Sequence, residues 1–281
     1  MVEPGTSNMQ IDRLPLAHAL LVRLRCGALV AAFLLIWSGP VAAQLRTAQP
    51  EGQSGWTRKE LVRARQHMIV TAHPAGSEAG QSILRAGGSA VDAAIAAQLV
   101  LNLVEPQSSG IGGGAFLVHW DAARNAMATY DARERAPLAA REDRLLLEGE
   151  PRSFERVVAS GLSVGVPGLV RGLELAHKRH GRLPWARLFE PAIRMAEEGA
   201  PIGVRLNVLL AGAGAGAFSP AARAYFFDAQ GKPWPAGTRL KNPAFAATLK
   251  AIRDRGADGF YKGPVAEAIV AAVHGAARWP G

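Results

Sequence analysis

Residues 87–104 read GGSAVDAAIAAQLVLNLV, and this stretch predicts a buried helix with a defined start. The two leading glycines end any preceding helix, because glycine readily adopts the left-handed conformation found at helix ends. Ser89, followed three residues later by Asp92, resembles a capping box with a shorter acid and predicts a helix over residues 90–104. Almost every position of this helix is apolar, so it must be buried on nearly all sides.

Signals for strands and helices are mixed on both sides of this helix. We predict strands at residues 68–72, 115–120, 126–131 and 160–166, with the middle two paired around 121–125. We predict further helices at residues 77–86, 168–179, 184–198, 243–255 and 265–273. The Ala/Gly tract at residues 209–218 predicts a loop or a loose helix. Because strict βαβ alternation is missing, we expect an α+β fold, a layered αββα sandwich, and not a doubly wound sheet.

The first residues have the pattern of a secretory signal peptide. Arg23 and Arg25 precede an uncharged apolar run, and Pro40 and small residues lead to a cleavage site after Ala43. We therefore expect a signal peptide over residues 1–43, a flexible lead-in over 44–66 and one domain over 67–281, in an exported, periplasmic or extracellular protein. The alternative is an uncleaved membrane anchor, because the charge-free stretch extends to Leu45.

Composition excludes several other classes of protein. The formal charge is +9, but 26 of the 32 basic residues are arginines scattered singly, so we expect no nucleic-acid partner. The single cysteine, Cys26, lies within the predicted signal peptide, which leaves no disulfide or cysteine nucleophile in the mature chain. His177 and His180 have the spacing of a two-histidine metal face, but neighbouring Lys178 and Arg179 favour a solvated basic helix end. We expect no metal site and no cofactor.

The loop GIGGG at residues 110–114 looks at first like a phosphate-binding loop. Its context is reversed, because it follows a predicted helix and precedes a predicted strand, whereas a phosphate loop follows a strand and opens a helix. We therefore interpret Gly110, Gly112, Gly113 and Gly114 as structural glycines that provide positive φ angles and tight backbone passage.

The sequence GLSVG at residues 161–165 matches the nucleophile elbow of serine hydrolases. Asp228 or Asp258 together with His274 would supply the remaining groups in the right chain order. An elbow needs a helix directly after its serine, and Pro167 holds the preceding residue in an extended conformation. No oxyanion motif precedes the serine, so we keep this interpretation as an alternative only.

Three blocks in the same order and spacing resemble the N-terminal part of gamma-glutamyltransferase precursors. They read GGSAVDAA at 87–94, PQSSGIGGG at 106–114 and DARERAP at 131–137, and weaker blocks at 160–168 and 258–263 extend the resemblance over residues 68–281. The resemblance implies the N-terminal nucleophile hydrolase fold, incomplete here without the strands of a second subunit. A sheet edge and one face should then be uncovered. The resemblance also places the glycine loop near the active site. We interpret the aromatic pair in the last block as packing.

The resemblance implies a reaction as well. Such a precursor cuts itself, and the freed N-terminal threonine of the small subunit attacks gamma-glutamyl amides, usually glutathione, with water or an amino acid as the acceptor. Residues 1–281 contain no segment resembling that subunit. We therefore expect an interrupted precursor, with no catalytic residue in this chain, a small subunit as the missing partner and no turnover by this chain alone.

Arg133 is the one residue to which the resemblance gives a direct substrate role. A gamma-glutamyl substrate presents a free α-carboxylate, which a guanidinium can hold by two parallel charge-assisted hydrogen bonds. The alternative is a structural ion pair between Arg133 and Asp131 or Glu134. Arg135 departs from the apolar residue expected at its position.

Two other functional interpretations stay open. One is a non-catalytic remnant that binds acidic amino acids weakly through Arg133, and the other is a beta-lactam (cephalosporin) acylase of the same fold. Glutamate binding without turnover would favour the first, whereas turnover of a glutaryl-cephalosporin by the completed enzyme would favour the second.

Overall fold

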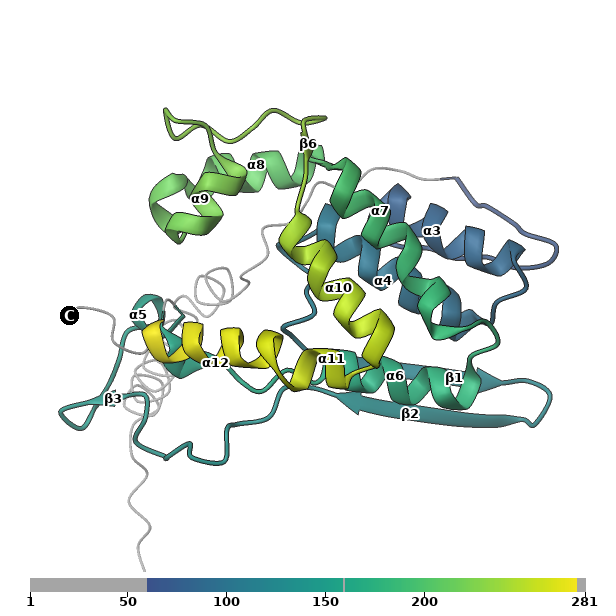
Figure 1. Cartoon of the computed structure of the whole chain (residues 1–281), viewed down its shortest axis with the longest axis horizontal. Coiled ribbons are helices and arrows are strands. Elements are labelled where there is room, and N and C mark those ends of the chain that lie inside the picture. Colours follow the sequence, from purple (N-terminus) through teal and green to yellow (C-terminus); the bar gives the residue numbers. More distant parts are fainter. Residues whose placement is uncertain (1–59, 159, 277–281) are drawn as a thin grey trace, which may run out of the picture. The chain divides into compact units, whose positions relative to one another are not determined.

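A computed structural model describes residues 60–158 and 160–276 of the chain (Figure 1). The predicted signal peptide and residues 44–59 of the predicted lead-in lie outside the described part, while residues 60–66 are exposed and form neither helix nor strand. No helix within the described ranges is long and apolar enough to cross a membrane. The longer helices are α3 (Pro74–Arg85), α4 (Ala90–Val104), α6 (Leu169–His180), α7 (Glu190–Glu198), α8 (Val204–Ala213), α10 (Pro243–Arg255) and α12 (Pro264–Ala276).

Helix α4 forms the centre of the main hydrophobic core. Its apolar side chains include Ile95, Val100 and Val104, all without solvent exposure, and it packs against α3, α6, α7 and the short 3₁₀ helix η2 (Trp185–Phe189). The predicted helix and its capping box are confirmed, because the Asp92 N–H donates to the Ser89 hydroxyl and the Ser89 N–H donates to the Asp92 carboxylate. A helix surrounded in this way has the all-round apolar surface that the sequence predicts.

The two predicted paired strands are also confirmed. Strands β1 (Ala115–Asp121) and β2 (Ala126–Ala132) form an antiparallel hairpin in which Phe116 pairs with Asp131 and Trp120 with Met127. The face that contains Tyr130 and Ala132 packs against α6, which runs along the hairpin (Figure 1). The opposite face exposes large apolar side chains, as the sequence analysis expects: Phe116, Val118, Trp120 and Met127.

A second, smaller core lies under α8 and the short helix α9 (Pro220–Phe226). Ile202, Leu206, Leu210 and Phe227 form it, beside the two-residue strands β5 (Ala200–Pro201) and β6 (Arg239–Leu240). The predicted loop or loose helix at residues 209–218 is in fact the end of α8 followed by the 3₁₀ turn η3 (Ala215–Ala217). Leu206 and Leu210 on one face of α8 are buried in this core.

Two predicted strands are wrong. Residues 68–72 form no strand in the described part of the chain; Ile69 packs against the core while Val70 is exposed, and the Thr71 hydroxyl donates to the His73 carbonyl. Residues 160–166 begin as the 3₁₀ turn η1 (Gly161–Ser163). There the Ser160 and Ser163 hydroxyls donate to backbone carbonyls three residues earlier, which competes with strand pairing.

The remaining short elements complete the chain. The predicted helix at 184–198 is divided, because η2 precedes α7. The other short elements are β3 (Leu146–Leu147), β4 (Glu150–Pro151), α5 (Phe154–Val158) and α11 (Asp258–Tyr261).

Asp92 joins the start of α4 to a turn ninety residues away. Its carboxylate is fully buried, and one oxygen accepts the backbone N–H groups of Ser89 at 2.8 Å, Arg182 at 2.9 Å and Leu183 at 3.0 Å. The His177 ring lies 3.6 Å from the other oxygen. This one side chain therefore fixes the position of α4 relative to the end of α6.

We predict that Asp92→Ala strongly destabilises the protein. The substitution leaves three backbone donors without their acceptor, and each unsatisfied buried donor costs about 1–3 kcal/mol. The free energy of unfolding, measured by denaturant titration, should fall by about 3 kcal/mol or more. Asp143→Ala is the matched control, since Asp143 pairs with Arg141 at the surface and should contribute under about 1 kcal/mol. A loss for Asp92→Ala no larger than that of the control would contradict this role.

Candidate functional site

Three segments that are distant in sequence meet around Arg133. The Gly113 carbonyl, in the glycine loop, accepts the N–H groups of Gly168 and Leu169 at the start of α6, both at 3.1 Å. Arg135 and Val166 form an isolated antiparallel bridge, with N–H···O distances of 3.1 and 2.7 Å. The glycine loop, the end of β2 and the entry to α6 are thus connected by backbone hydrogen bonds.

Glycines allow these segments to approach. A Cβ on Gly114 would lie 2.7 Å from the Ala132 carbonyl oxygen and 2.8 Å from the Arg133 Cα. On the other side, a Cβ on Gly168 would lie 2.6 Å from the Arg133 carbonyl oxygen and even closer to that of Ala132. Real Cβ atoms do not tolerate such distances, so the backbone of Arg133 is held between two positions that only glycine can occupy.

The prediction for the glycine loop is correct in part. Gly114 provides tight backbone passage, and Gly113 provides the carbonyl that binds the start of α6. The predicted positive φ angles are wrong, because Gly110, Gly112, Gly113 and Gly114 are all outside the left-handed region. A Cβ on Gly110 or Gly112 would meet no atom within 4 Å. The loop does follow a helix and precede a strand, as the sequence analysis expects.

The Arg133 side chain is more than half exposed and lies beside Glu134. Its Nη1 is 3.0 Å from Glu134 Oε2, yet that oxygen is buried and accepts no hydrogen bond from any described residue. The proximity is therefore electrostatic, without an aligned N–H. Asp131 binds the backbone N–H of Arg133 at 3.0 Å and not its guanidinium. The predicted alternative of an ion pair is thus present with Glu134, in a loose form that leaves the guanidinium accessible.

A cavity of about 510 Å³ opens beside Arg133. Its charged lining consists of three guanidinium groups, from Arg133, Arg135 and Arg144, and the single carboxylate of Glu134. Gly112 and the segment 163–165 complete the wall. Such an excess of positive charge suits a ligand with a carboxylate group. Arg144 lies in the charged stretch at residues 141–156, for which we predict neither helix nor strand, so no local signal marked it for this site.

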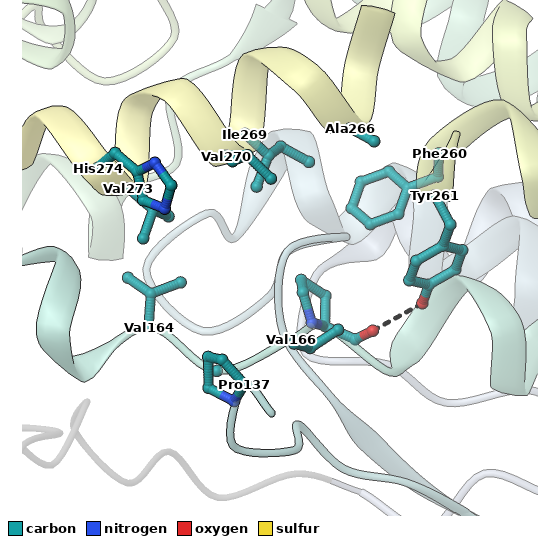
Figure 2. Close-up of a pocket in the computed structure, with 12 residues that line it drawn as sticks. Pro137, Val164, Val166, Phe260, Tyr261, Ala266, Ile269, Val270, Val273 and His274 are labelled. Atoms are coloured by element: carbon teal, nitrogen blue, oxygen red, sulfur yellow. Dashed lines mark hydrogen bonds between the residues drawn. The ribbon is translucent and has the colours of Figure 1, made fainter. Parts of the chain in front are cut away.

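The other side of the segment 164–167 faces an apolar cavity of about 280 Å³, drawn in Figure 2. Val164 and Gly165 line both cavities. Phe260 is buried beside this cavity, and the Tyr261 hydroxyl donates to the Pro167 carbonyl at 2.7 Å, the dashed line in Figure 2. The prediction that the aromatic pair of block 258–263 serves packing is confirmed. It supports the segment that forms the wall of the Arg133 cavity.

The serine-hydrolase alternative is wrong. The Ser163 hydroxyl donates to the Ser160 carbonyl, Val164 is extended, and the next helix begins only at Leu169, so no elbow forms. Asp258 binds Arg171 at 2.8 Å and Lys262 at 2.9 Å instead of a histidine. These two cations lower the pKa of Asp258 to about 2, which is typical of a surface ion pair.

The expected solvated helix end is wrong for both histidines of α6. The His177 ring is mostly buried, with Nε2 2.9 Å from the Leu183 carbonyl oxygen. His180 stacks on His119 at 3.8 Å between ring centres, and its Nε2 lies 2.6 Å from the Tyr130 hydroxyl. No group of three His, Cys, Asp or Glu residues is placed to hold a metal ion in the part of the chain that the structure describes.

We predict that Gly168→Ala disrupts the Arg133 site. Its new Cβ would overlap the carbonyl oxygens of Ala132 and Arg133, and such overpacking costs about 1–3 kcal/mol. Gly212→Ala in α8 is the matched control, because its Cβ would meet open space and alanine favours a helix by about 0.5–1 kcal/mol. Thermal unfolding should show a lower Tm for the first variant and an equal or higher Tm for the second. Equal Tm values for Gly168→Ala and the unmodified protein would contradict the predicted close approach.

The chain matches the family model described as gamma-glutamyltranspeptidase over residues 76–277. The glutathione hydrolase proenzyme of Bacillus subtilis (strain 168) is 37% identical over 243 residues, which cover 86% of this chain and 41% of that protein. The chain spans between a third and about two fifths of the length of the first curated relatives that it matches.

Solved structures agree with this match. The crystal structure of Helicobacter pylori gamma-glutamyltranspeptidase gives a TM-score of 0.72 at 33% identity, covering 77% of this chain and 62% of that one. A cephalosporin acylase from Bacillus halodurans gives 0.68 at 30% identity, covering 81% of this chain and 43% of that one. The predicted α+β fold of the N-terminal nucleophile hydrolase type is confirmed, with part of that fold present in this chain. The chain belongs to the gamma-glutamyltranspeptidase family.

Proposed function

We propose that these residues form the large-subunit part of an enzyme that hydrolyses glutathione and other gamma-glutamyl amides or transfers their gamma-glutamyl group. The observation that carries the proposal is the cavity at Arg133, where three guanidinium groups surround one carboxylate. The family match over residues 76–277 supports the same conclusion. The nucleophile is the N-terminal threonine of a small subunit, and this chain contributes binding and orientation.

Arg133 holds the α-carboxylate of the substrate in this proposal. Its guanidinium is accessible and loosely held by Glu134, so a carboxylate with better geometry can replace that contact. Arg135 and Arg144 add positive potential at the same cavity. With the α-carboxylate fixed, the gamma-carbonyl is presented to the threonine, whose hydroxyl oxygen forms the ester bond while the amine leaves with a proton. Water or an amino acid then receives the glutamyl group.

The exposed hairpin face supports the proposed small subunit as a partner. Phe116 and Val118 on β1 and Met127 on β2 are each about two thirds exposed. Large apolar side chains gathered on one face of a two-stranded sheet are typical of a surface that another sheet or chain covers. Self-cleavage of a common precursor would generate both subunits. A signal peptide over residues 1–43 would direct the protein out of the cytoplasm, and after its cleavage residues 44–66 would form a flexible lead-in.

The cephalosporin acylase alternative is supported by the structural similarity to the Bacillus halodurans enzyme. A glutaryl side chain carries a carboxylate that Arg133 could equally hold. The family match and the curated relatives named glutathione hydrolases favour gamma-glutamyl substrates. Comparison of gamma-glutamyl and glutaryl-cephalosporin turnover by the two-subunit enzyme separates the two. A remnant that binds without turnover is the third outcome.

We predict that Arg133→Lys weakens the binding of S-methylglutathione to this chain about tenfold. Lysine keeps the charge but loses the second of two parallel hydrogen bonds, and a charge-assisted hydrogen bond contributes about 1.5 kcal/mol or more. Isothermal titration provides the Kd.

The control variant is Arg124→Lys. Arg124 is exposed and pairs with Asp121 at the far end of the hairpin, so the Kd of this variant for S-methylglutathione should not change. A second control is an analogue of the ligand without its α-carboxylate, whose weak binding Arg133→Lys should leave unaltered. Equal affinity of the Arg133→Lys variant and the unmodified chain for S-methylglutathione would overturn the role of Arg133.

We predict that the DNA after the Gly281 codon encodes a segment that begins with threonine and has the pattern of the family's small subunit. Translation of all three frames tests this directly, because a frameshift would place the segment out of frame. Such a segment in any frame supports the proposed two-subunit enzyme. Its absence from all three frames would contradict the proposal in favour of a remnant without turnover.

A further inference from the structure

A second polar cavity, of about 750 Å³, lies at the junction of three elements away from Arg133. The turn of the β1–β2 hairpin, the end of α6 and the start of α4 all contribute to its wall. Its ionisable lining residues are three arginines, three histidines and one acid: Arg124, Arg179, Arg182, His67, His119, His180 and Asp121. None of these residues belongs to the cavity at Arg133.

The positive charge at this cavity is not balanced by the acids around it. Asp121 is engaged by Arg124, with 3.2 Å between Arg124 Nη1 and Asp121 Oδ2. One carboxylate oxygen of the buried Asp92 accepts hydrogen bonds from backbone N–H groups, including that of Arg182. No carboxylate lies within 4.0 Å of the Arg179 or Arg182 guanidinium in the described part of the chain. Two cations therefore remain uncompensated on this wall.

His180 is affected by this excess charge. His180 stacks on His119 at 3.8 Å, and Arg179 lies over the Tyr130 ring with 5.8 Å between its Cζ and the ring centre. Burial lowers the pKa of His180, and the nearby His119, Arg179 and Arg124 lower it further, against an opposing effect of Asp121. An anion in the cavity would reverse this effect, because it favours the imidazolium form.

We propose that this cavity binds a phosphate dianion, free or as a phosphomonoester. A carboxylate offers two oxygens in one plane, which a single guanidinium can satisfy. A phosphate group offers three terminal oxygens in a tetrahedral arrangement and two charges, so it can accept hydrogen bonds from arginines and imidazoles on different walls at once. The volume of the cavity exceeds that of the phosphate group and leaves room for the organic part of an ester.

The test is a titration of the chain with inorganic phosphate, followed through the imidazole signals of His119 and His180 by NMR. We expect saturable shifts and a rise in the pKa of His180 when phosphate is bound. Arg182→Gln keeps the backbone N–H that binds Asp92, so the fold should persist, and it should weaken phosphate binding about tenfold. Arg179→Gln should do the same, with circular dichroism as a check on folding.

Arg194→Gln is the matched control, since Arg194 is exposed on α7, outside the cavity, and the change in net charge is the same. Its Kd for phosphate should stay within about twofold of the unmodified value, as expected for a distant charge that salt screens. An equal loss for Arg194→Gln and Arg182→Gln would overturn the proposal, because it would show attraction to net charge alone.

Comparison of ligands separates the chemical classes. Glycerol 3-phosphate that binds at least as tightly as inorganic phosphate would show that the source is a phosphomonoester, whereas tighter binding of inorganic phosphate would favour the free anion. Glutarate that binds as tightly as either would contradict a phosphate site. Arg133→Lys should leave phosphate binding unchanged, so that failure of this site and failure of the proposed gamma-glutamyl site are distinguishable.

Discussion

The close approach of backbone segments at Ala132 and Arg133 is the constraint on which the candidate site depends. Gly114 lies against one side of this dipeptide and Gly168 against the other, at distances that exclude a Cβ on either. Hydrogen bonds from Gly168 and Leu169 to the Gly113 carbonyl hold the two glycines in register. The backbone of Arg133 is therefore fixed, while its side chain extends into a cavity where it can exchange Glu134 for a ligand. A rigid backbone with an accessible guanidinium is what oriented carboxylate binding requires.

This constraint needs a scaffold that does not move, and α4 provides it. The helix is buried on nearly all sides, its start is capped by Ser89 and Asp92, and Asp92 also binds the turn after α6. Since α6 begins at the glycine contact and ends at the Asp92 contact, the same helix connects the Arg133 site to the cationic cavity at its other end. The segment 163–165 before α6 lines the Arg133 cavity, whereas Arg179 and His180 of α6 itself line the cationic cavity, so each site uses different residues.

The sequence predicts those parts of the fold in which local signals agree with packing. The capped helix at 90–104 and the alternating hairpin strands have the periodicity and boundaries that the structure shows. The failures occur where hydroxyl groups compete with the backbone: Ser160 and Ser163 convert a predicted strand into a 3₁₀ turn. Gly168 lies in a recognised block, but its contact with Arg133 connects positions 35 residues apart and has no local signature. The packing of His180 on His119 and Tyr130 is equally non-local.

In the proposed enzyme, Arg133 binds the α-carboxylate of a gamma-glutamyl ligand. A crystal structure of this chain with S-methylglutathione tests it most directly. We expect the α-carboxylate to lie against both terminal nitrogens of Arg133, with the Glu134 contact lengthened and the backbone at Gly114 and Gly168 unchanged. A ligand whose carboxylate lies elsewhere, with Arg133 still beside Glu134, would show that Arg133 does not bind the α-carboxylate.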